Sequence, residues 1–536
     1  MESQDSSTVS RWSIEEVVGQ LFCVSVGHHS DGAYQVADSL DATVSLVREY
    51  HLGGVCYFPV GAHGAEPATI RRMVTTLQAA DSTPLIISID QEGGLVTRMR
   101  EPATRWPSAM AQAAGADWDV VRRIARLSGE ELRSAGVNHV YAPVADVNVE
   151  PLNPVIGIRS PSSSPHVVAQ YCRSAVTGLA ESDVASCLKH FPGHGNTHVD
   201  SHVGLPLLET SIEQWRATEA IPFVEGIAAG ADSVMIGHLR APGLDPSGAP
   251  ATFSAPMVTG LLRRELGFEG VIVTDALDMD GAQLEGGPGA SCVAALKAGV
   301  DQLLMPRDAG ACVKAVLAAV VEGTLNEHDL RASATRILTL KRKLGLFHAV
   351  DRKELSVTYS TEAAAAIARS LTWRDPAATF ALQPDEAVTV MFDPEPPSAG
   401  RGIEDVPVEL AHALQRHGHP TRLVKLGEPA DAGSVCLLIL RDAWRFPEVA
   451  AAVRKLCSGP NAPAIVVAAR SPYDSGILDA SLPLLLTYGD VPGVAGQVAA
   501  VLMGRTARGV LPVDLPTDGE GRIGWPRRLR IRGVDV

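Results

Sequence analysis

The sequence predicts a (β/α)8 barrel followed by a smaller α/β sandwich domain. With 536 residues, of which 46% are hydrophobic, the chain is too long for one ordinary domain and has enough apolar material for sizeable cores. Eight short apolar segments alternate with helical stretches over about 300 residues. Polar residues follow several of these segments, as they do at the mouth of a barrel.

The order of the elements supports a barrel over a shorter doubly wound sheet. The expected strands are the apolar runs at 21–26, 53–58, 84–90, 139–146, 183–188, 232–238, 270–279 and 300–306. One expected helix spans 13–20, and a second helical stretch ends at about residue 51. The other expected helices lie at 66–80, 117–135, 165–182, 211–229, 255–266, 290–298, 309–322 and 327–344.

A second alternation of strands and helices follows the barrel. Its expected strands lie at 388–392, 434–440, 464–469 and 482–488, and a helix is expected at 361–372. The predicted division is an N-terminal tail at 1–12, the barrel at 13–346, a linker with a helix at 347–384 and the sandwich at 385–536. This domain shows no convincing phosphate-binding glycine pattern.

Charge and cysteine usage limit the possible partners and compartment. The net charge of -15 argues against nucleic acid and anionic membranes, and favours a neutral or cationic small substrate. The eight cysteines form no CxxC pair and are expected as buried thiols, although disulfides remain an alternative. The polar N-terminus has no signal-peptide core, so we expect a cytoplasmic protein. The sequence leaves its oligomeric state open.

The segment Lys189–His202, KHFPGHGNTHVDSH, has the highest density of potentially reactive side chains. Its four histidines are spaced by four residues, but Pro192, Gly193 and Gly195 would break a helix. We therefore expect a loop at the end of a strand. HFPGH has the H-x-x-x-H spacing of some zinc hydrolases but lacks their glutamate and helix, so neither a metal nor a cofactor is expected.

Charged or imidazole side chains follow five different expected strands, and a barrel would direct them to one mouth. These residues are Asp90, Asp146, Lys189 with His190, His238 and Asp275.

Six motifs now indicate a family. IDQEGGLVTR, APVADV, VIGIRS, KHFPGHGNTHVDSH, DSVMIGH and VTDALDM, in this order, resemble the glycoside hydrolase family 3 β-N-acetylglucosaminidases of the NagZ-like, two-domain form. RILTLKRKLGLF resembles the end of that family's barrel, and RSPYD and GVLPVDLP resemble its second domain. The resemblance covers nearly the whole chain and implies a retaining enzyme that removes a terminal β-linked N-acetylglucosamine.

The resemblance also implies the catalytic residues. Asp275 matches the nucleophile; the alternative is an aspartate that caps the next helix. Asp200 and His202 match a pair in which the carboxylate orients a histidine acid/base. Histidine suits this role because its ordinary pKa of about 6.5 lies near neutrality.

The residues expected to bind sugar follow from the same motifs. Asp90 matches a carboxylate that accepts hydrogen bonds from sugar hydroxyls. The matched donors to hydroxyls or to the N-acetyl arm are Arg98, Arg159, Lys189 and His190. His238 could line the pocket near the nucleophile or could equally be a buried core histidine.

Two departures from the family pattern leave the leaving group open. Asn196 stands where the family usually has aspartate, and Ser160–Pro165 replaces a stretch with an aromatic residue and glycine, which would alter the wall near the second sugar site. Phosphate could replace water as the acceptor, because a neutral histidine does not repel it as a carboxylate would. The sequence also allows a β-glycosidase for a specialised metabolite or a noncatalytic sugar-binding protein.

Overall fold

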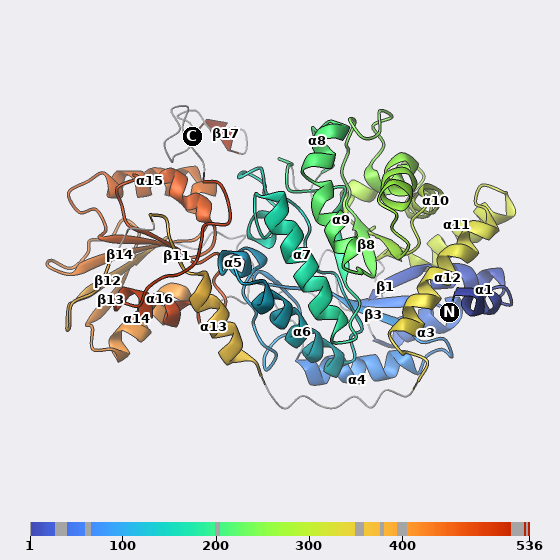
Figure 1. Ribbon diagram of the computed structural model, residues 1–536, viewed down its shortest axis with the longest axis horizontal. Coiled ribbons are helices and arrows are strands. Elements are labelled where there is room, and N and C mark those ends of the chain that lie inside the picture. Colours follow the sequence, from blue (N-terminus) through green and yellow to red (C-terminus); the bar gives the residue numbers. More distant parts are fainter. Residues whose placement is uncertain are drawn as a thin grey trace.

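The computed structural model describes residues 2–26, 40–58, 66–198, 204–348, 358–375, 380–393 and 405–515, together with the short strands β17 (Arg530–Ile531) and β18 (Val534–Asp535). Figure 1 shows two domains side by side, with the barrel on the right and the second domain, in orange and red, on the left.

The first domain is a barrel of eight parallel strands. They are β1 (Phe22–Val26), β2 (Gly54–Tyr57), β3 (Ile86–Ile89), β6 (His139–Val140), β7 (Cys187–Phe191), β8 (Ser233–Ile236), β9 (Val271–Thr274) and β10 (Leu303–Leu304). Two arcs, β10-β1-β2-β3-β6 and β7-β8-β9, form the wall. Parallel bridges between His139 and Ala185 and between Val273 and Gln302 join the arcs. The predicted barrel is confirmed.

Helices surround this wall. They are α2 (Ile14–Gln20), α3 (Leu40–Tyr50), α4 (Pro67–Gln78), α6 (Trp118–Ala135), α7 (Pro165–Ala180), α8 (Ile212–Ala217), α9 (Ala220–Ala228), the π-helix η3 (Pro256–Glu265), α10 (Pro288–Ala298), α11 (Ala309–Val321) and α12 (Glu327–Lys343). Polar N-caps begin several of them: Ser13 and Ser211 form capping boxes, and Asp117 and Asp308 bind the amide three residues on.

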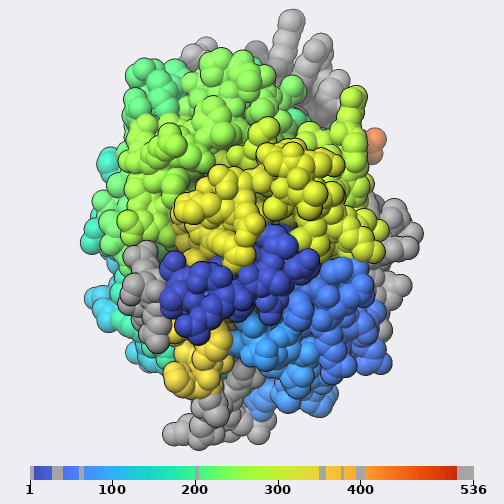
Figure 2. All heavy atoms as spheres, turned by 90° about the vertical axis from the view of Figure 1, so that its right-hand side faces the viewer, coloured from blue at the N-terminus to red at the C-terminus, as the bar shows by residue number. Residues whose placement is uncertain are grey.

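The first residues, expected as a tail, contain helix α1 (Glu2–Val9), which packs against α12. Figure 2 shows this dark blue segment lying across the yellow part of the barrel. Asp5 is fully buried and accepts a hydrogen bond from Thr339 Oγ1 at 3.0 Å, and Arg331 Nη1 donates to Val9 O at 2.7 Å. Such buried polar contacts fix the segment to the barrel.

Short elements between β3 and α6 were not expected from the sequence. They are the hairpin β4 (Gln91–Gly93) and β5 (Val96–Thr97) and helix α5 (Ala109–Ala114). Their shortness explains why no periodic pattern announces them. The hairpin follows Asp90 directly and so belongs to the mouth of the barrel. Three-residue 3-10 helices also occur in barrel loops, at η1 (Gly157–Arg159), η2 (Ala251–Phe253) and η4 (Asp280–Ala282).

The second domain is the predicted α/β sandwich. Its sheet has the order β11 (Thr372–Trp373), β16 (Leu484–Leu486), β15 (Ile465–Ala468), β14 (Val435–Leu440), β12 (Val388–Phe392) and β13 (Thr421–Lys425). All pairs are parallel except β11 with β16. Its helical elements are α13 (Ser360–Ser370), α14 (Val406–Arg416), η5 (Ala443–Arg445), α15 (Pro447–Cys457), η6 (Pro472–Ile477) and α16 (Val494–Leu502). Separate apolar cores include residues of this sheet.

One of these cores continues into the barrel. Met110, Ala111 and Ala114 of α5 pack into the same cluster as Trp444 and Tyr473 of the second domain. Helix α5 accordingly lies beside the second domain in Figure 1. Burial of apolar side chains from both domains in one cluster stabilises their contact.

Candidate active site

A cavity of about 360 Å³ opens at the carboxyl end of the barrel strands. Its floor includes Cys56, Tyr141 and Met235, which belong to the apolar cluster inside the barrel. The structure brings six of the predicted site residues to its lining. They are Asp90, Arg98, Arg159, Lys189, His190 and Asp275.

Glu92 ties together one wall of this cavity. Arg159 Nε and Nη2 donate to its two carboxylate oxygens, each at 2.9 Å. Lys189 Nζ lies 2.6 Å from Glu92 Oε1 and 2.8 Å from Asp90 Oδ1. Burial opposes ionisation of Glu92, but Arg159 and Lys189 outweigh it and hold the pKa of Glu92 well below its ordinary value. The wall therefore keeps fixed charges that can donate to and accept from sugar hydroxyls.

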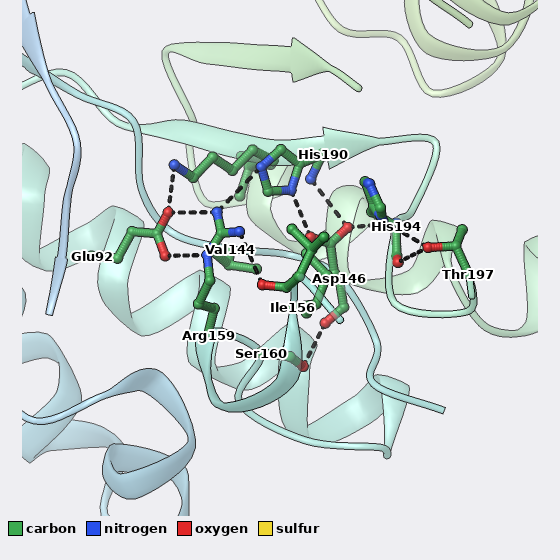
Figure 3. Close-up of polar contacts among 12 residues, drawn as sticks. Glu92, Val144, Asp146, Ile156, Arg159, Ser160, His190, His194 and Thr197 are labelled. Atoms are coloured by element: carbon green, nitrogen blue, oxygen red, sulfur yellow. Dashed lines mark hydrogen bonds and ion pairs between the residues drawn. The ribbon is translucent and has the colours of Figure 1, made fainter. Parts of the chain in front are cut away.

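His190 is held by Asp146, which is fully buried (Figure 3). His190 Nδ1 donates to Asp146 Oδ2 at 2.7 Å. The other oxygen, Oδ1, accepts from the backbone N–H of His190 at 3.2 Å and of His194 at 2.7 Å. A carboxylate on Nδ1 fixes the ring orientation and leaves Nε2 toward Arg159, 3.5 Å away.

The strand that carries Lys189 and His190 differs from the predicted one. Strand β7 spans Cys187–Phe191 rather than 183–188, so both residues lie in the strand and not in the following loop. A sequence with charged groups is not expected to form a buried strand. In this strand each such group has a partner: Lys189 pairs with Asp90 and Glu92, and His190 pairs with Asp146.

Asp275 follows β9 directly and is half-buried at the cavity. Its backbone N–H donates to Ile236 O at 2.9 Å, and its Oδ1 accepts from the next amide, Ala276 N–H, at 2.8 Å. The alternative role as a cap of the next helix does not fit, because η4 has Met279 as its N-cap and α10 has Gly287. Asp275 therefore caps neither helix, and it stands where a strand-end nucleophile would stand.

His238 matches the second of its two interpretations. It is fully buried, and its ring nitrogens lie 2.7 Å from Thr252 Oγ1 and 2.9 Å from Ala276 O. It is not among the described residues that line the cavity. The ring thus contacts the backbone immediately after Asp275.

Asp200 and His202 lie outside the described residues. The segment that leads to them is firmly held at its base: Asn153 Nδ2 donates to His194 O at 2.8 Å, and His194 Nδ1 lies 2.8 Å from Thr197 Oγ1. Burial lowers the pKa of His194 to about 4, so its ring is neutral at pH 7. Asn196, one of the two departures from the family pattern, is half-buried in this base.

The stretch Ser160–Pro165, the second departure from the family pattern, contacts the second domain. Ser160 Oγ donates to Asp146 O at 2.7 Å, and Ser162 Oγ donates to Pro512 O of the second domain. Ser163 Oγ donates to Asp514 Oδ2 at 3.1 Å. Two of these serines hydrogen-bond across a domain interface.

Sequence reasoning missed the roles of Glu92 and Asp146. Both were visible as acidic residues at or beside strand ends, Glu92 two positions after Asp90 and Asp146 at the end of an expected strand. Their partners lie 67 and 44 residues away in the chain, and only the fold brings them together.

Other site classes receive no support in the described part of the chain. No group of three or more His, Cys, Asp or Glu residues there could hold a metal ion. Within those residues, no helix is both long and apolar enough to cross a bilayer. All eight cysteines are described and are free thiols, and six of them are buried.

Comparison with known proteins agrees with this geometry. The family model described as "Glycosyl hydrolase family 3 N terminal domain" matches residues 13–340, more than half of the chain. The chain belongs to glycosyl hydrolase family 3.

Within the family, the similarity is to the hexosaminidase type of glycoside hydrolase. A "Beta-hexosaminidase A" of Pseudoalteromonas piscicida is 38% identical over 56% of this chain and 54% of its own length, so the match spans about half of that relative. A "Beta-N-acetylglucosaminidase/beta-glucosidase" of Cellulomonas fimi is 30% identical over 80% of this chain and 72% of the relative.

A solved structure shows the same two-domain fold. The family 3 β-N-acetylglucosaminidase of Paenibacillus sp. str. FPU-7 is 30% identical and superposes with a TM-score of 0.84 over 94% of this chain and 99% of that one. The barrel and the α/β sandwich thus recur together in a relative of similar length.

Proposed function

We propose that the protein is a retaining exo-β-N-acetylglucosaminidase. The observation that carries this proposal is the position of Asp275 at the end of β9, on the same cavity as Asp90, Lys189, Arg159 and His190. A strand-end carboxylate beside a cluster of hydroxyl donors and acceptors suits attack on the anomeric carbon of a bound sugar. The names of the relatives supply the sugar, a terminal β-linked N-acetylglucosamine.

Sugar binding follows from the donors and acceptors of the cavity wall. Asp90 accepts hydrogen bonds from hydroxyls, and the buried cations of Lys189 and Arg159 donate to them. Arg98, whose guanidinium lies 4.6 Å from the centre of the Phe58 ring, adds a further donor. Because Lys189 and Arg159 are already held by carboxylates, they need little reorganisation when the sugar enters.

The chemistry takes two displacements. Asp275 attacks the anomeric carbon while His202 donates its proton to the leaving oxygen, so that a covalent glycosyl-enzyme forms and the alcohol departs. His202, now neutral, removes a proton from water, which attacks the same carbon and releases Asp275. Asp200 orients His202 and stabilises its charged form. The roles of Asp200 and His202 rest on the sequence motif.

The substrates that fit are small N-acetylglucosamine conjugates. They include muropeptide fragments from cell-wall recycling, chitooligosaccharides and small glycosylated metabolites. The net charge of -15 disfavours polyanionic substrates, and eight free cysteines fit a reducing, cytoplasmic setting.

Two related activities are outcomes of the same test. The Cellulomonas fimi relative is also named a beta-glucosidase, so the 2-acetamido group need not be essential. Phosphate could intercept the glycosyl-enzyme, because the proposed acid/base is a neutral histidine in the second step.

The deciding experiment follows the sugar product by proton NMR. An aryl β-N-acetylglucosaminide and the matched aryl β-glucoside are each incubated with the protein, with and without phosphate. We expect β-N-acetylglucosamine as the first product in both buffers and slower turnover of the glucoside. First release of the α-anomer would exclude retention, formation of a sugar 1-phosphate would identify a phosphorylase, and absence of turnover would overturn the proposal.

A further inference from the structure

The loop at 146–164, which we call the bridging loop, connects the sugar wall with the second domain. It begins at Asp146, which holds His190, and it carries Arg159 and Val155, which line the cavity. Only the 3-10 helix η1 gives it regular structure. Such an irregular loop also relies on contacts with its surroundings for a fixed shape.

Asn153 organises the centre of this loop. Its Oδ1 accepts from the N–H groups of Val155 and Ile156, at 2.9 and 2.8 Å. Its Nδ2 donates to His194 O at 2.8 Å and to Thr197 Oγ1 at 3.3 Å. The side chain is fully buried, so it couples the bridging loop to the segment that precedes Asp200 and His202.

The second domain holds the same position from the other side. Arg445 of η5 donates from Nη2 to Asn153 O at 3.2 Å and from Nη1 to Pro154 O at 3.1 Å. Its guanidinium lies 5.0 Å from the centre of the Trp444 ring, which restricts its rotation. One cation therefore binds two successive carbonyls of the loop.

A second contact holds the beginning of the loop. Asn148 Nδ2 donates to Tyr473 OH at 2.6 Å, and both side chains are 1% exposed. The Tyr473 ring packs edge-on against Trp444, with centroids 6.3 Å apart. Asn148 lies two residues after Asp146, which binds His190, so the Tyr473 contact holds the chain next to the cavity.

We propose that Arg445 and Tyr473 are positioning residues for the active site, acting through the bridging loop on Arg159 and Asp146. This inference rests on the proposed function for its kinetic readout. Neither residue is among the described residues that line the cavity, so their effect on the reaction must pass through the loop. A displacement of about 1 Å in a substrate-positioning group can cost on the order of 100-fold in rate.

The test compares Arg445→Met and Tyr473→Phe with Arg369→Ala. Met keeps the contact of Arg445 with Trp444, and Phe keeps the ring of Tyr473. Arg369 is a matched control because it bridges α13 and Asp117 of the barrel, with Nη1 3.0 Å from Oδ2, away from the bridging loop. We expect kcat/KM for the aryl glycoside to fall about tenfold in each test variant, by a rise in KM together with a fall in kcat, and to change less than about twofold in the control.

Two further measurements separate positioning from general destabilisation. Combined with Arg159→Ala, the Arg445→Met change should cost less than about twofold more, because the group it positions is already gone. Amide exchange at 146–164 and 190–197 should quicken in both test variants and not in Arg369→Ala.

Each outcome decides the proposal. Losses that are equal in Arg445→Met and Arg369→Ala, full additivity with Arg159→Ala, or unchanged exchange in both loop segments would overturn it. If Arg445→Met does not fold, Tyr473→Phe carries the same test. If the wild-type protein turns over no glycoside, the proposed function fails, while the exchange measurement still decides whether the second domain orders the loop.

Discussion

Both domains gather charged side chains at the carboxyl ends of parallel strands. In the described part of the chain, these side chains line a cavity in the barrel, whereas in the second domain they pair with one another. In the barrel, Asp90, Lys189 and Asp275 open onto about 360 Å³ of space. In the second domain, the residues that follow strands are between 1% and 5% exposed and bind one another. They are Asp393, Arg441, Arg470 and Asp490.

This difference shows that charged residues at the ends of parallel strands do not by themselves form a binding cavity. A closed barrel surrounds its strand ends with loops on all sides, whereas the open sheet of the second domain presents its edge to the barrel. There Ser108 Oγ donates to Tyr488 O at 2.6 Å, and Arg445 binds the bridging loop. The carboxyl ends of the strands in the second domain thus form a contact surface for the barrel.

The largest expected effect separates the strand-end aspartates of the two domains. Asp275→Ala should lower kcat on the order of 10⁴-fold, because no other group can form the glycosyl-enzyme, while binding of N-acetylglucosamine stays measurable by calorimetry. Asp393→Ala, the matched change after β12, should leave kcat within about twofold. A kcat for Asp275→Ala within tenfold of the wild type would remove Asp275 as the nucleophile.

The next prediction compares one buried arginine–carboxylate pair from each domain. Glu92→Gln removes the carboxylate that pairs with Arg159 and Lys189, and Asp490→Asn removes a carboxylate that pairs with Arg470. Each change should lower the free energy of unfolding by about 3 kcal/mol in urea titrations. We expect Glu92→Gln also to lower kcat/KM, by about tenfold or more, because its partners Arg159 and Lys189 line the cavity, whereas Arg470 is not among the described lining residues. Equal kinetic losses in the two variants would contradict the comparison.

The same comparison explains how far the sequence could predict the structure. The barrel and the position of Asp275 at the end of a strand were predictable, because apolar runs that end in a polar residue are a local pattern. The start and end of β7 were not, because Lys189 and His190 are acceptable in a buried strand only through Asp90, Glu92 and Asp146, which are distant in the chain.

The domain interface was beyond reach for a similar reason. From the sequence, Ser160–Pro165 was expected to alter the wall near a second sugar site, because it departs from the family pattern after Arg159. Its hydrogen bonds go to Pro512 and Asp514, about 350 residues away, and no periodic pattern reports such a pairing. Strand β13 was missed because it is an edge strand with exposed polar residues.

The last prediction extends the comparison to buried carboxyl groups. Burial raises the pKa of Glu219, which packs against Gly193 below the active-site loop, to about 7, and it raises the pKa of Asp393 in the second domain to about 6. A folded-state pKa above that of the unfolded chain means that the folded protein holds the proton more tightly. The favourable contribution is therefore complete below the ordinary pKa of about 4 and is lost as the pH rises through the folded-state value.

A glutamine or asparagine cannot ionise, so each amide variant should gain on the wild type as the pH rises. For Glu219→Gln, the difference in unfolding free energy from the wild type should grow by about 3 kcal/mol between pH 4.5 and 7.5. For Asp393→Asn, the same growth should end about one pH unit lower, because its folded-state pKa is lower and the backbone N–H and guanidinium of Arg441 favour its charged form. Urea unfolding at half-unit pH steps measures both curves. A difference that does not vary with pH would show that Glu219 is ionised throughout this pH range in the folded protein, so that burial does not raise its pKa.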